Sequence, residues 1–258
     1  MKVNNMGLKK VLIPVPSYGF DPTEVAIPWK IFSKNNFNIV FITPRGEKAT
    51  ADLIMLNGKG LGIWRSVLCA RQDAVIAYNE MEKSASFCKP LKYTDVQEKN
   101  FDAIFLPGGH DKRVKEYLES HVLQQLVVDF FVSEKPVGAI CHGVVLAARS
   151  ISATTGKSVI YHYKTTCLLK SQELLAYNLT RLRLKEYYLT YPNKTVEDEV
   201  KSVLSKSSNF LKGPTPLLRD DENKLNRGYV VKDRNYLSAR WPGDIYSFSL
   251  EFVKMIKE

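Results

Sequence analysis

Short runs of apolar residues alternate with segments of helical period along most of the chain. The apolar runs that read as buried strands lie at residues 10–15, 37–43, 101–106 and 137–140. Helical patterns follow these runs, the first ending near Asn35 and the others covering residues 112–119, 121–133 and 143–149. This alternation is typical of an α/β fold, and it predicts a doubly wound, mostly parallel sheet with helices on both faces, a flavodoxin-like sandwich.

The last hundred residues carry further predicted elements. A strand is expected at Lys157–Tyr163, and two late strands, Gly228–Val231 and Tyr236–Ala239, are expected to form a hairpin. Pro242–Lys257 reads as a closing helix, because its apolar residues recur at helical spacing.

Two long segments exceed what a strand-to-helix connection needs. They cover about residues 46–100 and 165–213, and the second carries Glu, Lys, Leu and Tyr at helical spacing. Long insertions in compact domains are commonly lids or binding elements. We therefore expect residues 1–258 to form one domain, with these two insertions adding a helical cap to the sandwich.

Composition and charge exclude several classes of function. The net charge is +10, but Lys and Arg are dispersed without a block of five, so no nucleic-acid partner is expected. No run of eighteen apolar residues is present, so no membrane span is expected, and a leader pattern is lacking, which favours the cytoplasm. The four cysteines and four histidines show no metal-ligand spacing, so no metal site is expected.

One cysteine lies where a predicted strand meets a predicted helix. The strand at 137–140 runs directly into Cys141, then His142, then a helix opened by Gly143. A thiol at a helix N-terminus should lose its proton more easily than a free thiol, which suits a nucleophile. A lone cysteine is more often a buried structural residue, but this strand–Cys-His-Gly–helix context favours a nucleophile.

Two other features follow predicted strands and should reach the same sheet edge. Glu24 comes after the first strand, and Gly108, Gly109 and His110 come after the third. A carboxyl beside a thiol can act as general acid or base, and the diglycine can turn its N–H groups toward an oxyanion. Each feature alone has a simpler explanation: Glu24 as an acid in the first turn of a helix, the glycines as an ordinary loop.

Taken in order along the chain, these residues resemble a known family. Glu24, the sequence LPGGH at 106–110, AICHG at 139–143 and SARWPGD at 238–244 resemble the ThiJ/PfpI superfamily, which has the class I glutamine amidotransferase-like fold. The PGGH form is most similar to the heat-shock chaperone and glyoxalase III branch. The resemblance implies that methylglyoxal is converted to D-lactate without a cofactor.

The resemblance also assigns roles to individual residues. It implies Cys141 as nucleophile, His142 as its acid/base partner and Glu24 as a proton-shuttling carboxyl, with backbone N–H groups of Gly109 and His142 in the oxyanion hole. Family members often carry an acid that orients the histidine, but residues 161–167 contain no carboxylate. Glu173 is the nearest acid downstream, and it is either that third residue or a surface helix residue.

Several functions stay open at this point. The first is a cysteine-dependent enzyme, glyoxalase III-like or amidase/hydrolase-like, acting on a reactive carbonyl or acyl compound. The second is a stress-response chaperone or a cysteine redox sensor without turnover. A glutamine amidotransferase is disfavoured, because no histidine follows His162. Tyrosines at 187, 188 and 191 are expected in a dimer interface, so the predicted assembly is a homodimer.

Overall fold

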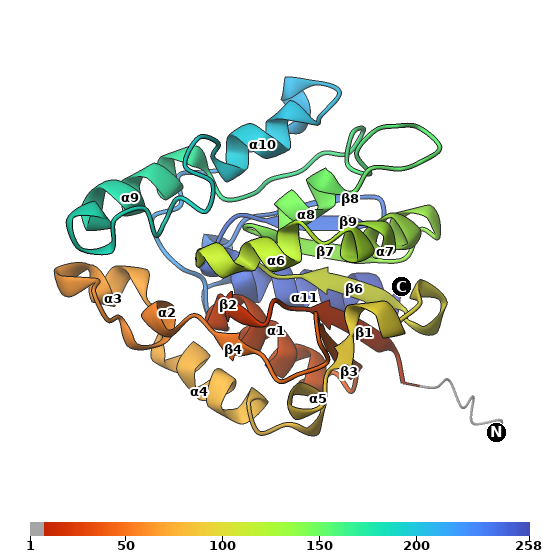
Figure 1. Cartoon of the computed structure of the whole chain (residues 1–258), viewed down its shortest axis with the longest axis horizontal. Coiled ribbons are helices and arrows are strands. Elements are labelled where there is room, and N and C mark those ends of the chain that lie inside the picture. The colour runs from red at the N-terminus through yellow and green to blue at the C-terminus, as the bar shows by residue number, and fades with distance from the viewer. Residues whose placement is uncertain (1–7) are drawn as a thin grey trace.

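The computed structural model of the protein describes residues 8–258, and a seven-stranded sheet lies at its centre (Figure 1). The strands, in their order across the sheet, are β5 (Leu91–Lys92), β3 (Asn38–Thr43), β1 (Lys10–Pro14), β6 (Ala103–Leu106), β7 (Val137–Ile140), β9 (Tyr236–Ala239) and β8 (Val230–Asp233). Only β8 runs antiparallel to its neighbour. The predicted mostly parallel α/β sheet is confirmed, as is the hairpin of the last two strands.

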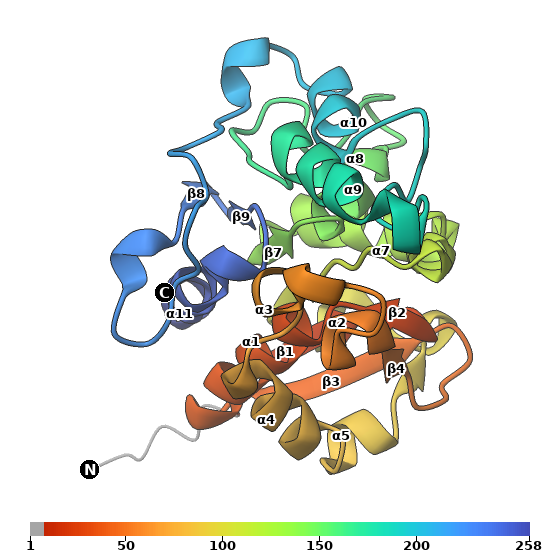
Figure 2. The same ribbon diagram turned by 90° about the vertical axis from the view of Figure 1, so that its left-hand side faces the viewer.

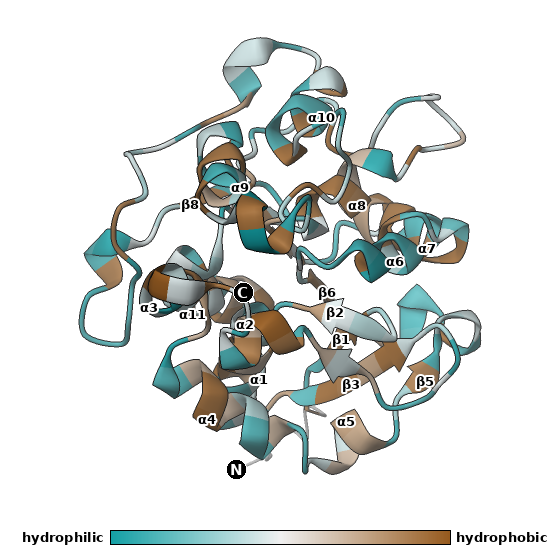
Figure 3. Ribbon diagram, turned by 60° about the vertical axis from the view of Figure 1, so that its left-hand side comes forward, coloured by the Kyte–Doolittle hydropathy of each residue, from teal (hydrophilic) through white to brown (hydrophobic). Residues whose placement is uncertain are grey.

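Helices cover both faces of this sheet (Figures 1 and 2). One face carries α1 (Pro22–Lys34), α4 (Gln72–Met81), α5 (Ala85–Cys88) and α11 (Ile245–Lys257); the other carries α6 (Lys115–Leu118), α7 (His121–Val132) and α8 (Gly143–Arg149). In Figure 3, α8 is coloured as hydrophobic along most of its length, and residues 143–148 are all buried. Burial on both sides explains why β6 and β7 are continuous apolar runs rather than alternating ones.

The remaining elements are short or belong to the insertions. They are β2 (Tyr18–Phe20) paired with β4 (Thr50–Ala51), α2 (Leu53–Asn57), α3 (Arg65–Leu68), α9 (Lys170–Leu184) and α10 (Val196–Ser202). Single 3₁₀ turns lie at Gly62–Trp64, Tyr93–Asp95, Glu98–Asn100, Lys112–Val114, Ser207–Asn209, Leu225–Arg227 and Pro242–Asp244. No helix within residues 8–258 combines the length and the apolar character needed to cross a bilayer.

The start of α1 follows from its first residues and brings Glu24 into the interior. Asp21 Oδ1 accepts hydrogen bonds from the N–H groups of Thr23 (2.8 Å) and Glu24 (3.1 Å), and Pro22 occupies the first turn, where no N–H is needed. The helix therefore begins immediately after β2. Glu24 lies in its first turn and is fully buried.

The predicted strand at Lys157–Tyr163 is wrong. This segment forms turns outside the sheet, and its one strand-like contact is an isolated bridge between Ile151 and Ser158. The reason lies in the sheet order: β9 pairs with β7 in parallel and occupies the position that the segment would need. Its apolar residue Ile160 is nevertheless fully buried and belongs to the main hydrophobic core.

The two insertions meet each other above the carboxyl ends of the strands. Met55 and Leu61 from the first insertion form a small apolar cluster with Ala176 and Tyr188 from the second. Figure 2 shows α9 facing α2 and α3 across this contact. Here we call the chain between α9 and α10 that takes part in this contact, residues 185–192, the roof segment.

Candidate active site

Cys141 lies in a sharp turn between β7 and α8. Its φ angle is +55°, a left-handed conformation that is costly for a residue with a side chain, and its N–H donates to the Ala239 carbonyl oxygen at 3.2 Å. The helix can follow so closely because residue 143 is glycine. A Cβ atom there would overlap the Leu106 carbonyl and lie 2.8 Å from the Pro107 oxygen. The geometry presents a thiol at the carboxyl edge of the sheet, as the motif predicts.

Glu24 lies beside this thiol, with Gly108 between them. The Gly108 N–H donates to Glu24 Oε2 at 2.8 Å. A Cβ atom at residue 108 would lie 2.8 Å from that same oxygen and 2.9 Å from Cys141 Cβ, so only glycine fits there. The other carboxyl oxygen, Oε1, is buried and has no hydrogen-bond partner among residues 8–258. The structure thus brings together Glu24, Gly108 and Cys141, as the sequence predicts.

His142 connects the thiol to a hydrogen-bonded chain. Its Nδ1 lies 3.4 Å from Cys141 Sγ, and its Nε2 lies 3.0 Å from Thr190 Oγ1. The Thr190 hydroxyl donates to the His110 carbonyl oxygen at 3.1 Å, so it must accept from His142 Nε2–H. The proton on Nε2 leaves a lone pair on Nδ1 facing the thiol. His142 is therefore oriented as a base toward Cys141.

Burial dominates the ionisation of these groups. It raises the pKa of Cys141 and of Glu24 well above their usual values, and their neighbouring carboxyl groups raise both pKa values further. Burial likewise lowers the pKa of His142 well below its usual value. Burial therefore favours the neutral thiol, the protonated carboxyl and the neutral imidazole in the resting site. The predicted easy loss of the thiol proton is therefore wrong for this conformation, because desolvation outweighs the helix N-terminus.

The backbone N–H groups behave partly as predicted. That of Gly108 is used by Glu24, whereas those of Gly109 and His142 donate to no other backbone or side-chain oxygen within residues 8–258. The His142 N–H lies next to the Cys141 sulfur and partly opposes the rise in the thiol's pKa. These two donors are available to an oxygen bonded to the carbon that the sulfur attacks.

His110 contributes its ring to the wall of the site. The ring centroid lies 5.0 Å from that of His142 and 4.9 Å from that of Tyr188, both at steep angles. Burial lowers the pKa of His110 to about 4, so the ring is neutral at pH 7. Its Nδ1 atom is buried, with no hydrogen-bond partner in the part of the chain that the structure describes.

The roof segment closes the site. The Tyr187 hydroxyl donates to Asp52 Oδ2, and Glu186 accepts from Lys112 Nζ at 3.2 Å. Tyr188 is 3% exposed and Cys141 is 1% exposed, so the thiol is covered in this conformation. Two of the tyrosines expected in a dimer interface, at 187 and 188, belong to this segment; the predicted homodimer stays a prediction.

Glu173 does not orient His142. It is buried in α9, and its Oε2 accepts from the Val196 N–H at 2.9 Å, at the start of α10. The position next to His142 Nε2 belongs to Thr190, a hydroxyl rather than a carboxylate. Sequence reasoning missed Thr190, and no local signal marks it, because a threonine in a connecting segment has no distinctive spacing. Glu173 is a structural residue that joins the two helices of the second insertion.

We expect Asp52→Asn to remove a pH dependence of stability that wild type shows. Burial raises the pKa of Asp52 from 3.8 to about 6. Below pH 4 the acid is protonated in both folded and unfolded states. As the pH rises from about 4 to 6, only the unfolded chain releases this proton, so folded stability falls, by about 2–3 kcal/mol in total.

Asparagine keeps the cap of α2 through Oδ1, and its Nδ2 amide can donate to the Tyr187 hydroxyl oxygen in place of accepting from it. Urea unfolding of both proteins from pH 4 to pH 7 measures the effect: the wild-type free energy of unfolding should fall relative to that of Asp52→Asn. If the free energy of unfolding changed with pH in the same way for both proteins, the raised pKa of Asp52 would be contradicted.

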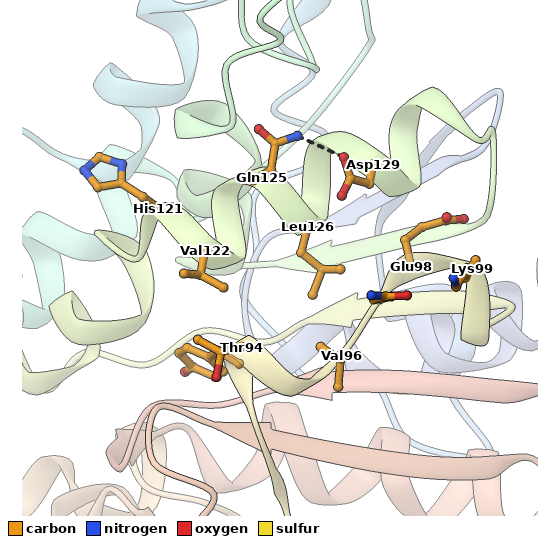
Figure 4. A pocket seen from close by; sticks show the side chains of 11 residues that line it. Thr94, Val96, Glu98, Lys99, His121, Val122, Gln125, Leu126 and Asp129 are labelled. Carbon is orange, nitrogen blue, oxygen red and sulfur yellow. Dashed lines mark hydrogen bonds between the residues drawn. The ribbon is translucent and has the colours of Figure 1, made fainter.

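A separate groove lies away from this site. It has a volume of about 600 Å³ between α7 and residues 93–99, and Figure 4 shows Leu126, Gln125 and Asp129 on its helical side. None of the candidate catalytic residues lines it. Within residues 8–258 no group of three or more His, Cys, Asp or Glu side chains is placed to hold a metal ion.

Comparison with known proteins gives one family match. The family described as ThiJ/PfpI family-like matches residues 15–214. The uncharacterised protein C14C4.04 of Schizosaccharomyces pombe is 33% identical over 123 residues, which span 47% of this chain and 45% of that protein. The glutathione-independent glyoxalase hsp3102 of the same organism is 27% identical over 154 residues, spanning 58% and 60% respectively. The chain therefore matches about half the length of these two relatives.

A solved structure supports the same fold. Glyoxalase III from Candida albicans superposes with a TM-score of 0.63, covering 96% of this chain and 97% of that one, at 18% sequence identity. At that identity the likeness establishes the architecture alone. The reaction must be argued from the residues of the site.

Proposed function

Because the chain belongs to the ThiJ/PfpI family, we propose that it is a cysteine-dependent enzyme of the glyoxalase III type, which converts a 2-oxoaldehyde to a 2-hydroxy acid. The observation that carries this proposal is that Cys141 lies beside two proton-transfer groups, one that can accept a proton and one that can donate a proton. His142 Nδ1 is an acceptor at 3.4 Å from the sulfur, and Glu24 is a buried, protonated carboxyl on the other side. Addition to a carbonyl needs one group to take the thiol proton and another to protonate the oxygen.

The first step forms a hemithioacetal. His142 Nδ1 takes the thiol proton as the sulfur bonds to the aldehyde carbon C1. The electron pair of the C1=O bond moves onto its oxygen, near the N–H groups of Gly109 and His142, and Glu24 protonates that oxygen. Glu24 is then a carboxylate and His142 an imidazolium.

The second step moves hydrogen from C1 to C2. The Glu24 carboxylate takes the C1 proton, His142 protonates the C2 oxygen, and an enediol results. Glu24 then returns a proton to C2 while the C1 hydroxyl proton passes to His142, which gives a thioester. The oxidation of C1 balances the reduction of C2, so no external oxidant or cofactor is consumed.

Hydrolysis completes the cycle. Water adds to C1 and gives a proton to the Glu24 carboxylate, and the C–S bond breaks as His142 reprotonates the sulfur. One 2-oxoaldehyde and one water yield one 2-hydroxy acid, and all three side chains return to their resting state. Because Cys141 is covered, substrate enters when the roof segment moves, which breaks the Tyr187–Asp52 and Thr190–His142 contacts.

Production of lactate from methylglyoxal without glutathione tests the proposal. Chiral chromatography should show a single enantiomer, D-lactate, formed in proportion to protein concentration, since C2 is protonated from one side inside the closed site. No lactate above the protein-free rate would contradict it. If Cys141 were then oxidised selectively by peroxide, the redox-sensor or chaperone alternative would stand in its place.

We expect Thr190→Val to lower kcat about tenfold. The variant removes the acceptor that holds the proton on His142 Nε2, and a lost buried hydrogen bond of about 1–2 kcal/mol corresponds to this factor. Thr190→Ser keeps the hydroxyl and should retain most of the activity. The pH profile of kcat should shift for Thr190→Val alone, because the pKa of His142 changes. Equal losses for both variants would indicate a packing role instead.

A further inference from the structure

Several buried polar atoms at the carboxyl edge of the sheet have no partner within residues 8–258. They include Glu24 Oε1, His110 Nδ1, the Tyr188 hydroxyl and Trp241 Nε1. Glu24, His110 and Tyr188 are each less than one-tenth exposed. The Tyr188 ring lies 4.9 Å from the His110 ring, which lies 5.0 Å from that of His142, so Tyr188 and His110 belong to one wall of the site. A buried polar atom without a partner costs about 1–3 kcal/mol, so a ligand that accepts from the Tyr188 hydroxyl or the Trp241 indole N–H would remove part of this cost.

Trp241 lies on the same sheet edge as the thiol. Ile140 is paired with Ala239 in the register of β7 and β9, so the chain that leaves β9 at Arg240 and Trp241 emerges beside Cys141. Its indole N–H is a donor that finds no acceptor in the described part of the chain.

Arg219 lies over this indole. Its guanidinium carbon is 5.6 Å from the Trp241 ring centroid. Its terminal nitrogens donate to the carbonyl oxygens of Val67 (2.8 Å), Leu68 (3.4 Å) and Cys69 (3.1 Å) at the end of α3. These acceptors are neutral, and the arginine forms no ion pair within the described part of the chain. The main chain of the first insertion therefore holds a half-buried positive charge in a fixed orientation without neutralising it.

The positive charge of Arg219 affects the pKa values of groups in and around the site. Burial raises the pKa values of Glu24, Asp21 and Tyr188, and the positive charge of Arg219 opposes each rise. Two of the carbonyl groups that Arg219 contacts belong to Leu68 and Cys69, which pack against the cluster that contains Tyr188. Arg219 therefore borders this cluster, although it comes from the segment between the second insertion and β8.

We propose that Arg219, the Tyr188 hydroxyl and the Trp241 indole N–H form a subsite that binds a carboxylate at the end of the substrate far from Cys141. This inference rests on the proposed function and narrows it to 2-oxoaldehydes that carry a distal carboxylate. The three groups are all hydrogen-bond donors, one of them cationic, and a carboxylate accepts from several donors at once. An uncharged substrate such as methylglyoxal would leave the Tyr188 hydroxyl and the Trp241 indole without acceptors and Arg219 without a counter-ion.

Paired substrates test the subsite. 4,5-Dioxopentanoate carries the carboxylate and would give 2-hydroxyglutarate, whereas 2-oxohexanal has a similar length and no charge. We expect wild type to prefer the anionic compound about 10- to 100-fold in kcat/KM, the factor typical of a hydrogen bond to a charged group. Arg219→Gln should reduce this preference to about one, and Arg219→Lys should restore part of it.

Arg71→Gln is the matched control. Arg71 is a neighbouring arginine that donates to the Asp220 carbonyl oxygen and pairs with Asp73 at 3.6 Å, so its loss should leave the preference unchanged. An unchanged preference in Arg219→Gln, or an equal loss in Arg71→Gln, would overturn the subsite.

A binding measurement separates this proposal from the reaction itself. Calorimetry on Cys141→Ala should show tighter binding of 2-hydroxyglutarate than of 2-hydroxyhexanoate, and Arg219→Gln in the same background should abolish the difference. This result would support the carboxylate subsite even if wild type made no product. Turnover of methylglyoxal with equal binding of the two acids would leave the reaction standing and reject the subsite.

Discussion

Cys141→Ala is expected to lower kcat/KM for methylglyoxal by about 10³-fold or more. The substitution removes the atom that bonds to C1, and without that bond neither the hemithioacetal nor the thioester can form. Glu24, His142 and the two backbone donors stay in place. The remaining rate should therefore be the rate that these groups achieve together without a covalent bond to the substrate. Steady-state measurement of lactate formation gives the ratio directly.

The other cysteines provide the control for this result. Cys88 is exposed at the end of α5 and has no role in the proposed reaction, so Cys88→Ala should retain the wild-type rate. Equal rates for wild type and Cys141→Ala would end the enzymatic proposal, because every covalent step passes through that sulfur.

Asp244→Ala is expected to lower the free energy of unfolding by about 3–5 kcal/mol. Asp244 and Arg240 are 0% and 1% exposed, and their side chains are joined by two hydrogen bonds of 2.8 Å. Removing the carboxylate leaves a buried guanidinium without its counter-ion. The Tyr229 N–H, which donates to Asp244 Oδ1 at 2.9 Å, also loses its acceptor. Urea unfolding monitored by circular dichroism measures the loss.

An exposed ion pair supplies the comparison. Glu222 pairs with Lys34 at 3.5 Å, and both side chains are more than half exposed, so Glu222→Ala should change stability by less than about 1 kcal/mol. The double variant Arg240→Met, Asp244→Leu should be more stable than Asp244→Ala, because it leaves no unpaired charge. If Asp244→Ala and Glu222→Ala had equal effects, the buried pair would not have the proposed structural role.

Arg240 and Asp244 belong to the sequence SARWPGD at 238–244, which contributes to the likeness to the family. The likeness alone does not say what these residues do. In the fold, Arg240 and Asp244 join the end of β9 to the start of α11. Arg240 also donates to the carbonyl oxygens of Lys212 and Pro214, which precede Arg219. The motif therefore stabilises the chain near the site rather than reacting.

The strands and the approach of Glu24, Gly108 and Cys141 could be predicted from the sequence for a simple reason. Apolar runs and helical periods are local, and the carboxyl ends of parallel strands meet at one edge, whatever the rest of the chain does. The strand predicted at Lys157–Tyr163 failed because a local pattern cannot say which segment occupies the place beside β7. That place belongs to β9, almost a hundred residues further along the chain.

By itself, the sequence determined the α/β architecture and the meeting of a thiol, a carboxyl and a diglycine at one sheet edge. Only the tertiary structure decided that Thr190 orients His142, that Glu173 joins two helices, and that residues 185–192 cover the thiol. These outcomes depend on contacts between two insertions far apart in the chain. Burial raises the pKa of Cys141, and burial is a property of the packed molecule, which no run of neighbouring residues encodes.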